Sequence, residues 1–238
     1  MTATRAAERD YAERGDYHRH LDPHWSYAPI YVRKVRWADE MIASLPRNAR
    51  LLDVGAGEGA LVERYREQGR DIVGVDSAYE SAAVKKADLL TLPFEDGAFD
   101  VVLLLDVLEH VELLDQPKAL SEIARVLEDD GVLLMSVPNL AHFHSRLKFL
   151  LAGKLTRTSA VERHPGDRPL AEYEELLRET GFRIESRRGI FPTLPLVFRL
   201  VNRRPQTWGW MVGVLDAVLP FPGLSFLVAL QARKAGIE

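Results

Sequence analysis

A glycine-rich turn between two apolar stretches holds the residues of this sequence that are best suited to bind a ligand. Gly55, Gly57 and Gly59 follow the apolar run 50–54, and Asp76 ends the next apolar run. Glycines let the backbone turn sharply and let a ligand lie against it without meeting Cβ atoms. A carboxylate about 20 residues further along the chain can hold two ribose hydroxyls. This arrangement predicts a nucleoside-binding site at the end of a strand.

Two acidic residues beside the turn narrow the choice of nucleoside. The glycine spacing also fits the loose pattern of dinucleotide-binding turns. Asp53 and Glu58, however, are placed where a pyrophosphate would lie, and their charges would repel it. They suit a cationic ligand, such as the ammonium and sulfonium groups of S-adenosylmethionine.

Three further motifs follow the turn in order. They are Ala87-Asp88-Leu89, the segment 99–111 that ends in Glu109-His110-Val111, and the segment 131–139. Together with the glycine turn, these motifs resemble those of the class I S-adenosylmethionine-dependent methyltransferases. The resemblance covers roughly residues 48–140 and fades on either side.

The resemblance implies a fold and a cofactor. The fold would be a Rossmann-like, doubly wound α/β fold, with a seven-stranded, mostly parallel sheet, helices on both faces and added segments that cap the acceptor site. The cofactor would be S-adenosylmethionine. In the family, the acid at the position of Asp88 bonds the adenine amino group, and the next residue packs on the ring. The expected cofactor-binding residues are Asp53, Gly55, Gly57, Gly59, Asp76, Ser77, Asp88, Leu89 and Asp106.

Four histidines are candidates for deprotonating the methyl acceptor, because imidazole titrates near neutral pH. His110 stands in the Glu-His-Val motif, where a purely structural role is an equal alternative. His142, His144 and His164 lie in the segment expected to cover the acceptor. With Asp106 and Asp167 they could surround a divalent metal, but their spacing matches no known ligand signature, so no metal is expected.

The charges of the chain are unevenly distributed. Residues 50–137 carry 8 Lys and Arg against 19 Asp and Glu, whereas residues 141–204 carry 13 against 7. A basic segment after an acidic cofactor half favours an anionic acceptor, although a solvated arginine-rich surface is the alternative. The expected substrate-binding residues are Arg157, Arg163 and Arg168. Arg33 and Arg36 could clamp the methionine carboxylate or simply face solvent.

The end of the run 101–105 indicates the class of acceptor. It continues as Asp-Val-Leu-Glu-His, and not as the Asn/Asp-Pro-Pro-Tyr/Phe motif of enzymes that methylate base or amide nitrogens. We therefore expect no nucleic-acid partner. The segment 136–143 resembles that of methyltransferases acting on sugars and cell-surface polysaccharides, and of quinone O-methyltransferases. We expect methyl transfer to a hydroxyl of a small molecule, such as a sugar or an anionic natural product. The alternatives are a quinone or lipid-ring O-methyltransferase at the membrane surface and a non-catalytic cofactor-binding protein.

Alternating apolar periodicities place these residues on a single α/β domain. The expected strands are 50–54, 71–75, 86–89, 99–105, 131–137, 182–189 and 225–233. The expected helices are 30–45, 58–68, 78–84, 116–127, 140–151 and 169–180. The expected parts are an N-terminal lid (1–47), a cofactor core (48–140), acceptor-site and cap elements around the sixth strand (141–224) and the last strand (225–233).

The composition favours a cytoplasmic protein. The chain has no cysteine, and its charged N-terminus has no apolar core of a signal peptide. The apolar stretch 208–230 is long enough to cross a membrane, but its prolines and Asp216 break it into shorter elements. The mixture of basic and apolar residues in 141–152 and 191–219 is compatible with peripheral contact with a membrane. The sequence does not set an oligomeric state.

Overall fold

The architecture follows from a computed structural model, which describes residues 21–157 and 159–235. The first part of the expected N-terminal lid, residues 1–20, lies outside the described residues.

Seven strands form one sheet in the order β3-β2-β1-β4-β5-β7-β6. All neighbouring pairs are parallel except those of β7, which runs antiparallel to β5 and to β6. This confirms the expected doubly wound, mostly parallel sheet. The strands are β1 (Arg50–Val54), β2 (Asp71–Asp76), β3 (Val84–Lys86), β4 (Phe99–Leu105), β5 (Leu127–Pro138), β6 (Phe182–Pro192) and β7 (Ser225–Lys234).

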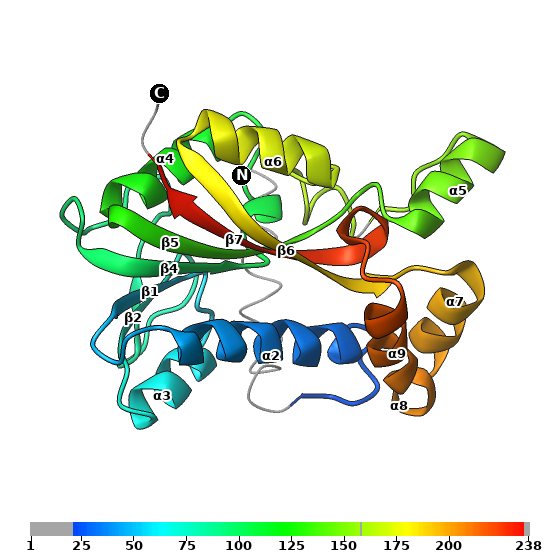
Figure 1. The fold of residues 1–238 in the computed structure, drawn as a ribbon, viewed down its shortest axis with the longest axis horizontal. Helices are drawn as coiled ribbons and strands as arrows, with labels where there is room; N and C mark the ends of the chain where they lie inside the picture. Colours follow the sequence, from blue (N-terminus) through cyan, green and yellow to red (C-terminus); the bar gives the residue numbers. More distant parts are fainter. Residues whose placement is uncertain (1–20, 158, 236–238) are drawn as a thin grey trace.

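Helices cover both faces of the sheet (Figure 1). One face packs against α4 (Gln116–Val126) and α6 (Leu170–Glu179), and the opposite face packs against α2 (Ala28–Ser44), α3 (Ala60–Glu67) and α9 (Trp210–Val218). Each face buries its own apolar cluster, because the strands of a sheet covered on both sides carry apolar residues on both sides.

The remaining elements gather beyond one end of the sheet (Figure 1). They are α5 (Phe143–Ala152), α7 (Pro195–Arg203), α8 (Pro205–Trp208) and the short 3₁₀ helix η2 (Pro222–Leu224). A second 3₁₀ helix, η1 (Leu108–His110), follows β4. No helix among the described residues is long and apolar enough to cross a membrane.

One predicted helix is wrong. Residues 77–78 and 81–83 form bends, and the expected strand 86–89 is found instead at β3. Side chains replace helical hydrogen bonds here: Asp76 accepts from the backbone of Ala78, and Ser81 Oγ accepts from the backbone N–H groups of Ala83 and Val84. Short polar side chains compete with helices in this way. The other expected elements are found within a few residues of their predicted bounds.

Candidate functional site

A cavity of about 1580 Å³ runs along the carboxyl ends of β1, β2, β4 and β5 and extends under α2 and the loop before α6. Ligands of open α/β sheets bind at this edge. Most of the expected cofactor-binding residues line the cavity. They are Gly55, Gly57, Asp76, Ser77, Asp88, Leu89 and Asp106.

The glycine turn is shaped by contacts that leave no room for side chains. Gly55 has a φ of +76°, and a Cβ atom there would lie 2.3 Å from Val107 Cγ2. Gly59 has a φ of +87° and precedes α3, and its Cβ atom would lie 2.7 Å from Val84 Cγ2. Glycine is therefore required at both positions, but only Gly55 also lines the cavity.

Asp76 holds the far side of this turn. Its Oδ2 accepts a hydrogen bond from Gly57 N at 2.9 Å, and its Oδ1 accepts one from Ala78 N at 2.8 Å. The carboxylate thus lies at the end of β2 facing the cavity and also fixes the backbone on either side of it.

Asp53 lies beneath the turn and does not line the cavity. It is 4% exposed. Burial raises the pKa of Asp53 to about 7, the nearby charge of Asp76 acts in the same direction, and the Lys34 ammonium opposes them. The carboxyl is therefore poised to change its charge near neutral pH.

Asp106 is the centre of a buried polar network at the end of β4. It has a φ of +59°, and it accepts hydrogen bonds from Tyr27 Oη, from Lys34 Nζ at 2.7 Å and from Ser136 Oγ. Burial alone would raise the pKa of Asp106, but the Lys34 charge and these hydrogen bonds hold it below its usual value. Asp106 is thus an ionised carboxylate with its partners fixed.

Lys34 is a site residue that the sequence analysis missed. It is 5% exposed, and its Nζ atom lies 5.1 Å from the centre of the Tyr31 ring. The sequence does contain a pattern that could have revealed Lys34. It follows Ile30 by four residues and precedes Trp37 by three, which places it on the same face of the helix as these two buried residues. A lysine on the apolar face of a helix indicates a buried partner.

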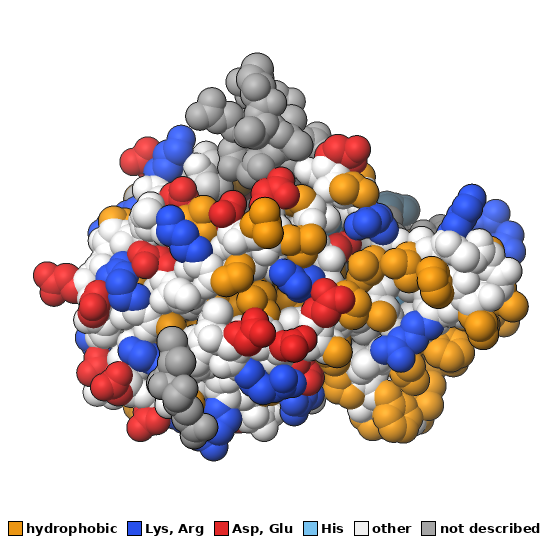
Figure 2. All heavy atoms as spheres, turned by 90° about the horizontal axis from the view of Figure 1, so that it is seen from above, with side chains coloured by type: hydrophobic (Ala, Val, Ile, Leu, Met, Phe, Trp, Pro, Cys, Tyr) orange, Lys and Arg blue, Asp and Glu red, His pale blue; other side chains and the backbone are white. Residues whose placement is uncertain are grey.

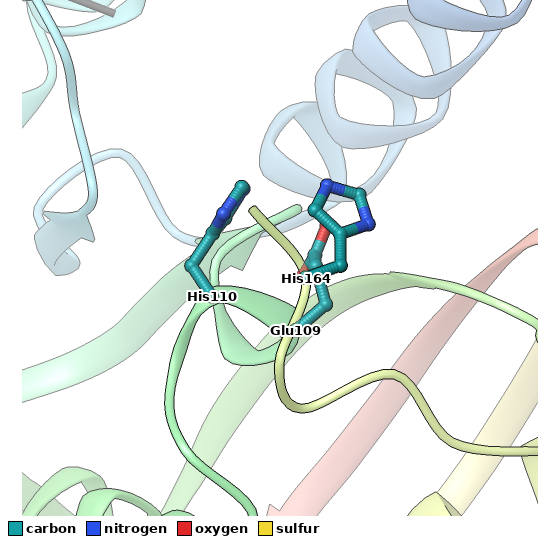
Figure 3. Close-up of side chains that lie close together, drawn as sticks. All are labelled: Glu109, His110 and His164. Atoms are coloured by element: carbon teal, nitrogen blue, oxygen red, sulfur yellow. The ribbon is translucent and has the colours of Figure 1, made fainter. Parts of the chain in front are cut away.

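Glu109, His110 and His164 form a compact cluster on the wall of the cavity (Figure 3). Each can place one nitrogen or carboxylate oxygen so that all these atoms lie within 4.8 Å of one another. The rings of the two histidines meet edge to face with their centres 4.7 Å apart. The structure thus joins the Glu-His-Val motif to the loop before α6.

The two histidines of the cluster are oriented through their Nδ1 atoms. His110 Nδ1 lies 2.7 Å from the carbonyl oxygen of Arg163, and His164 Nδ1 lies 3.4 Å from Asp167 Oδ1. Burial, together with the charge of His164, lowers the pKa of His110 to about 4. His110 is therefore a neutral imidazole at pH 7 and can accept a proton.

Glu109 is the least accessible member of the cluster and another residue that the sequence analysis left without a role. It is 1% exposed, and its Oε2 has no hydrogen-bond partner among the described residues. Burial and the charge of Asp106 raise the pKa of Glu109 well above its usual value. An unsatisfied buried carboxyl is costly, so it marks a place where a ligand is missing or a proton is held.

Two of the predicted histidines lie away from the cavity. His142 is fully buried, its Nδ1 lies 2.8 Å from Thr193 Oγ1, and it caps the N-terminus of α5. Its pKa is lowered to about 4 by burial and by His144. His144 stacks on Phe198 and does not line the cavity either. Both side chains pack at the base of α5 and do not line the cavity.

The predicted arginines divide in the same way. Arg157 and Arg163 line the cavity. Arg168 does not, because its Nε donates to Gln116 Oε1 at 2.6 Å and its side chain ties the loop to α4. Arg33 pairs with Asp216 instead of facing the cavity, and Arg36 is exposed. The loop before α6 therefore brings two arginines to the cavity, together with Glu162.

The sequence matches the family described as a methyltransferase domain over residues 24–187. A probable S-adenosylmethionine-dependent methyltransferase of Mycolicibacterium smegmatis is 31% identical over 151 residues, which make up 59% of this chain and 54% of the relative. A ubiquinone biosynthesis O-methyltransferase of Bordetella avium is 27% identical over 139 residues, which make up 51% of this chain and 56% of the relative. The chain spans about half the length of these relatives.

Solved structures share the fold at low sequence identity. The 1,6-didemethyltoxoflavin-N1-methyltransferase of Burkholderia thailandensis, solved with S-adenosylhomocysteine, has a TM-score of 0.60 and 18% identity, covering 96% of this chain and 87% of its own. A SAM-dependent methyltransferase from Archaeoglobus fulgidus has a TM-score of 0.53 and 20% identity, covering 86% of this chain and 94% of its own. At these identities the likeness concerns the fold alone.

Proposed function

We propose that this chain, which belongs to the methyltransferase family that its sequence matches over residues 24–187, transfers a methyl group from S-adenosylmethionine to a hydroxyl of a small anionic molecule. The observation that carries the proposal is the composition of one cavity. A nucleoside-binding turn lies on one part of its wall, and a histidine cluster with two arginines lies on another.

The residues on the cofactor side fit S-adenosylmethionine. Asp76 would hold the ribose hydroxyls, while Asp88 and Leu89 would meet the adenine. The acidic side chains of Glu58 and Asp76 line this part of the cavity and favour a cationic ligand over a pyrophosphate. When bound, the cofactor supplies a methyl group on a sulfonium, which leaves as a neutral sulfide.

Aromatic and basic groups on the acceptor side fit an anionic acceptor with a ring. Trp25 and Tyr31 line the cavity with their ring centres 5.9 Å apart, and Phe226 lies on the same wall. Arg157 and Arg163 add two guanidinium groups, which match the planar geometry of carboxylate and phosphate. A sugar or a phenolic ring bearing such a group would meet both kinds of contact.

Deprotonation of the acceptor is the chemical task of the protein. The attacking hydroxyl oxygen forms a bond to the methyl carbon, the carbon–sulfur bond breaks with its electron pair going to sulfur, and the hydroxyl proton must leave. The adjacent imidazoles of His110 and His164 bring ring nitrogens to the cavity wall, where one of them would take this proton. Positioning by the arginines and exclusion of water by the aromatic wall would supply the rest of the rate enhancement.

Two measurements test this proposal. Calorimetry with S-adenosylhomocysteine and with NAD tests the cofactor, and we expect binding of the first only. Transfer of labelled methyl to phenolic acids, sugar phosphates and their neutral counterparts then tests the acceptor. Binding without transfer to any compound in the panel or in a fractionated cell extract would instead support a non-catalytic cofactor-binding protein.

A further inference from the structure

We propose that Glu109, His110 and His164 bind a divalent metal cation on the wall of the cavity. The binding site is inferred from the geometry of these residues, and the role of the cation in methyl transfer rests on the proposed function. The three side chains come from η1 and from the loop before α6, which are more than 50 residues apart along the chain. They nevertheless bring two imidazoles and one carboxylate to within 4.8 Å (Figure 3).

The surroundings of the two imidazoles are those of metal ligands. A histidine ligand usually gives its second ring nitrogen to a carbonyl or a carboxylate, which fixes its orientation and tautomer. His110 does so to the backbone carbonyl of Arg163, whereas His164 Nδ1 lies 3.4 Å from Asp167 Oδ1 without forming a hydrogen bond to it. In His110, Nε2 is then the nitrogen suited to a metal.

The buried carboxyl group of Glu109 also points to a bound cation, independently of the two histidines. Its carboxyl group is almost fully buried, and one of its oxygens has no hydrogen-bond partner among the described residues. A cation coordinated by this oxygen would satisfy it. The pair of imidazoles is better suited to transition metals than to Mg²⁺ or Ca²⁺, which prefer oxygen ligands throughout.

Three protein ligands leave coordination positions open toward the cavity. An acceptor hydroxyl could occupy one of them, and a divalent cation lowers the pKa of a bound oxygen. The proton would leave to solvent, so no redox change or additional reactant is needed. With the cation bound, the hydroxyl would lose its proton because of the metal. Without the cation, an imidazole would accept that proton.

Direct binding of Co²⁺ tests the site without reference to activity. Chelator-treated protein is titrated with Co²⁺, and binding is followed by visible absorption and by calorimetry. We expect one equivalent to bind. Glu109→Gln and His164→Ala should each weaken binding at least tenfold, while His24→Ala, an exposed histidine outside the cluster, should bind as the parent does. Glu109→Gln keeps the volume of a neutral carboxyl, so the variant should fold.

The outcomes separate this inference from the proposed function. If Co²⁺ does not bind, or if it binds equally to the parent and to the cluster variants, the metal site is wrong. Binding of S-adenosylhomocysteine to the chelator-treated protein is measured in parallel. If the metal-free protein binds the cofactor and transfers methyl groups normally, the proposed function holds and the proposed role of the cation is wrong.

A second, independent observation concerns the surface beyond the end of the sheet, and from it we infer a docking face for anionic lipid. Large apolar side chains are exposed there on α5, α7 and α9. They include Leu150 at 81%, Leu151 at 75%, Leu196 at 71% and Trp210 at 63% exposure. Figure 2 shows apolar side chains gathered at this end of the molecule beside several basic ones.

The charges of the segments that contain α5, α7 and most of α9 indicate that the partner surface is anionic. Residues 141–161 and 193–215 contain no acidic residue. Their basic residues are Arg146, Lys148, Lys154, Arg157, Arg199, Arg203 and Arg204. Glu162 follows the first segment and Asp216 follows the second, and Asp216 is paired with Arg33. An exposed apolar face whose own segments carry only positive charges matches the headgroup region of an anionic bilayer.

Co-sedimentation with vesicles tests the docking face. We expect the protein to bind vesicles containing phosphatidylglycerol, to bind phosphatidylcholine vesicles weakly, and to dissociate as salt rises. The double variant Leu150→Asp/Trp210→Asp should lose this binding. Leu114→Asp is the matched control, because Leu114 is 93% exposed and lies outside α5, α7 and α9. Unchanged binding by the double variant, or self-association of the parent that the same substitutions abolish, would overturn the lipid assignment.

Discussion

Lys34 Nζ lies 2.7 Å from Asp106 Oδ2, and this ion pair joins α2 to the end of β4 within the wall of the cavity. The side chains are only 6% and 17% exposed. Removal of one partner of such a pair leaves the other charge buried, whereas removal of both can cost little. The pair therefore couples the position of the N-terminal helix to the cofactor side of the cavity.

A double-mutant cycle tests this coupling. Lys34→Met should lower the free energy of unfolding by about 3–5 kcal/mol, because the Asp106 carboxylate stays buried without its cation. Lys34→Met/Asp106→Asn should recover part of that loss. The measurement is urea denaturation of all variants. Arg50→Met, which breaks the half-exposed pair of Arg50 with Asp100, is the control and should cost about 1 kcal/mol or less. A double variant as unstable as the single one would contradict the coupling.

The second prediction concerns Asp76. Asp76→Ala should weaken binding of S-adenosylhomocysteine at least tenfold, because the variant loses both the proposed ribose contact and the acceptor for Gly57 N. Hydrogen bonds to a charged group contribute roughly 1.5–3 kcal/mol each. Calorimetry measures the affinity, and a melting curve shows whether the variant is folded. Asp76→Asn keeps an oxygen that can accept from Gly57 and should bind more tightly than Asp76→Ala. Equal affinity of Asp76→Ala and the parent would reduce Asp76 to a turn residue.

The third prediction uses the raised pKa of Asp53. A carboxyl with a pKa of about 7 in the folded state holds a proton that the unfolded state has already lost, between about pH 4 and pH 7. The Asp53 contribution to stability is therefore present at low pH and is lost as pH rises through 7. Its size is on the order of 4 kcal/mol, since each pKa unit corresponds to about 1.4 kcal/mol.

Asp53→Asn isolates this contribution. The variant cannot titrate at this position, so its stability relative to the parent should increase from about pH 4 to pH 7 and level off above pH 7. The measurement is the difference in unfolding free energy between the two proteins at each pH, without cofactor. This difference cancels the titration of groups that both proteins share. A difference that does not change with pH would show that Asp53 is ionised throughout.

The sequence predicted well which residues meet at the carboxyl ends of the strands, for a physical reason. The glycine turn, Asp76 and Asp88 are local features: each lies at or just after the end of a strand, and parallel strands bring their carboxyl ends to one edge. The predicted helix at 78–84 failed because side-chain hydrogen bonds from Asp76 and Ser81 outcompete helical ones there. The spacing of apolar residues in the sequence carries no information about such side-chain hydrogen bonds.

The acceptor side depends on packing between distant segments and was predicted only in part. Lys34 meets Asp106 across 72 residues, and His164 meets His110 across a loop that no local pattern places. His142 has the residue type of a catalytic base, but it is buried against Thr193. The identity of a residue gives its chemistry, and only the tertiary structure shows what it faces.

The last prediction separates the two arginines of the cavity wall from Arg168. Arg157→Ala/Arg163→Ala should raise the Michaelis constant for an anionic acceptor about tenfold or more and make it less sensitive to salt, because the screened attraction is gone. Affinity for S-adenosylhomocysteine should stay within about twofold of the parent value. Arg168→Ala should instead lower the melting temperature, since it breaks the hydrogen bond to Gln116.

Steady-state kinetics at low and high salt check this prediction. Arg178→Ala removes an arginine from α6 at a position outside the cavity and serves as the control for the loss of surface charge. It should leave the Michaelis constant and its salt dependence unchanged. If the double variant and Arg178→Ala respond alike, general surface charge attracts the acceptor and the arginines of the wall do not bind it. If a neutral analogue of the acceptor loses as much as the anionic one, the two arginines act by shaping the cavity and not by their charge.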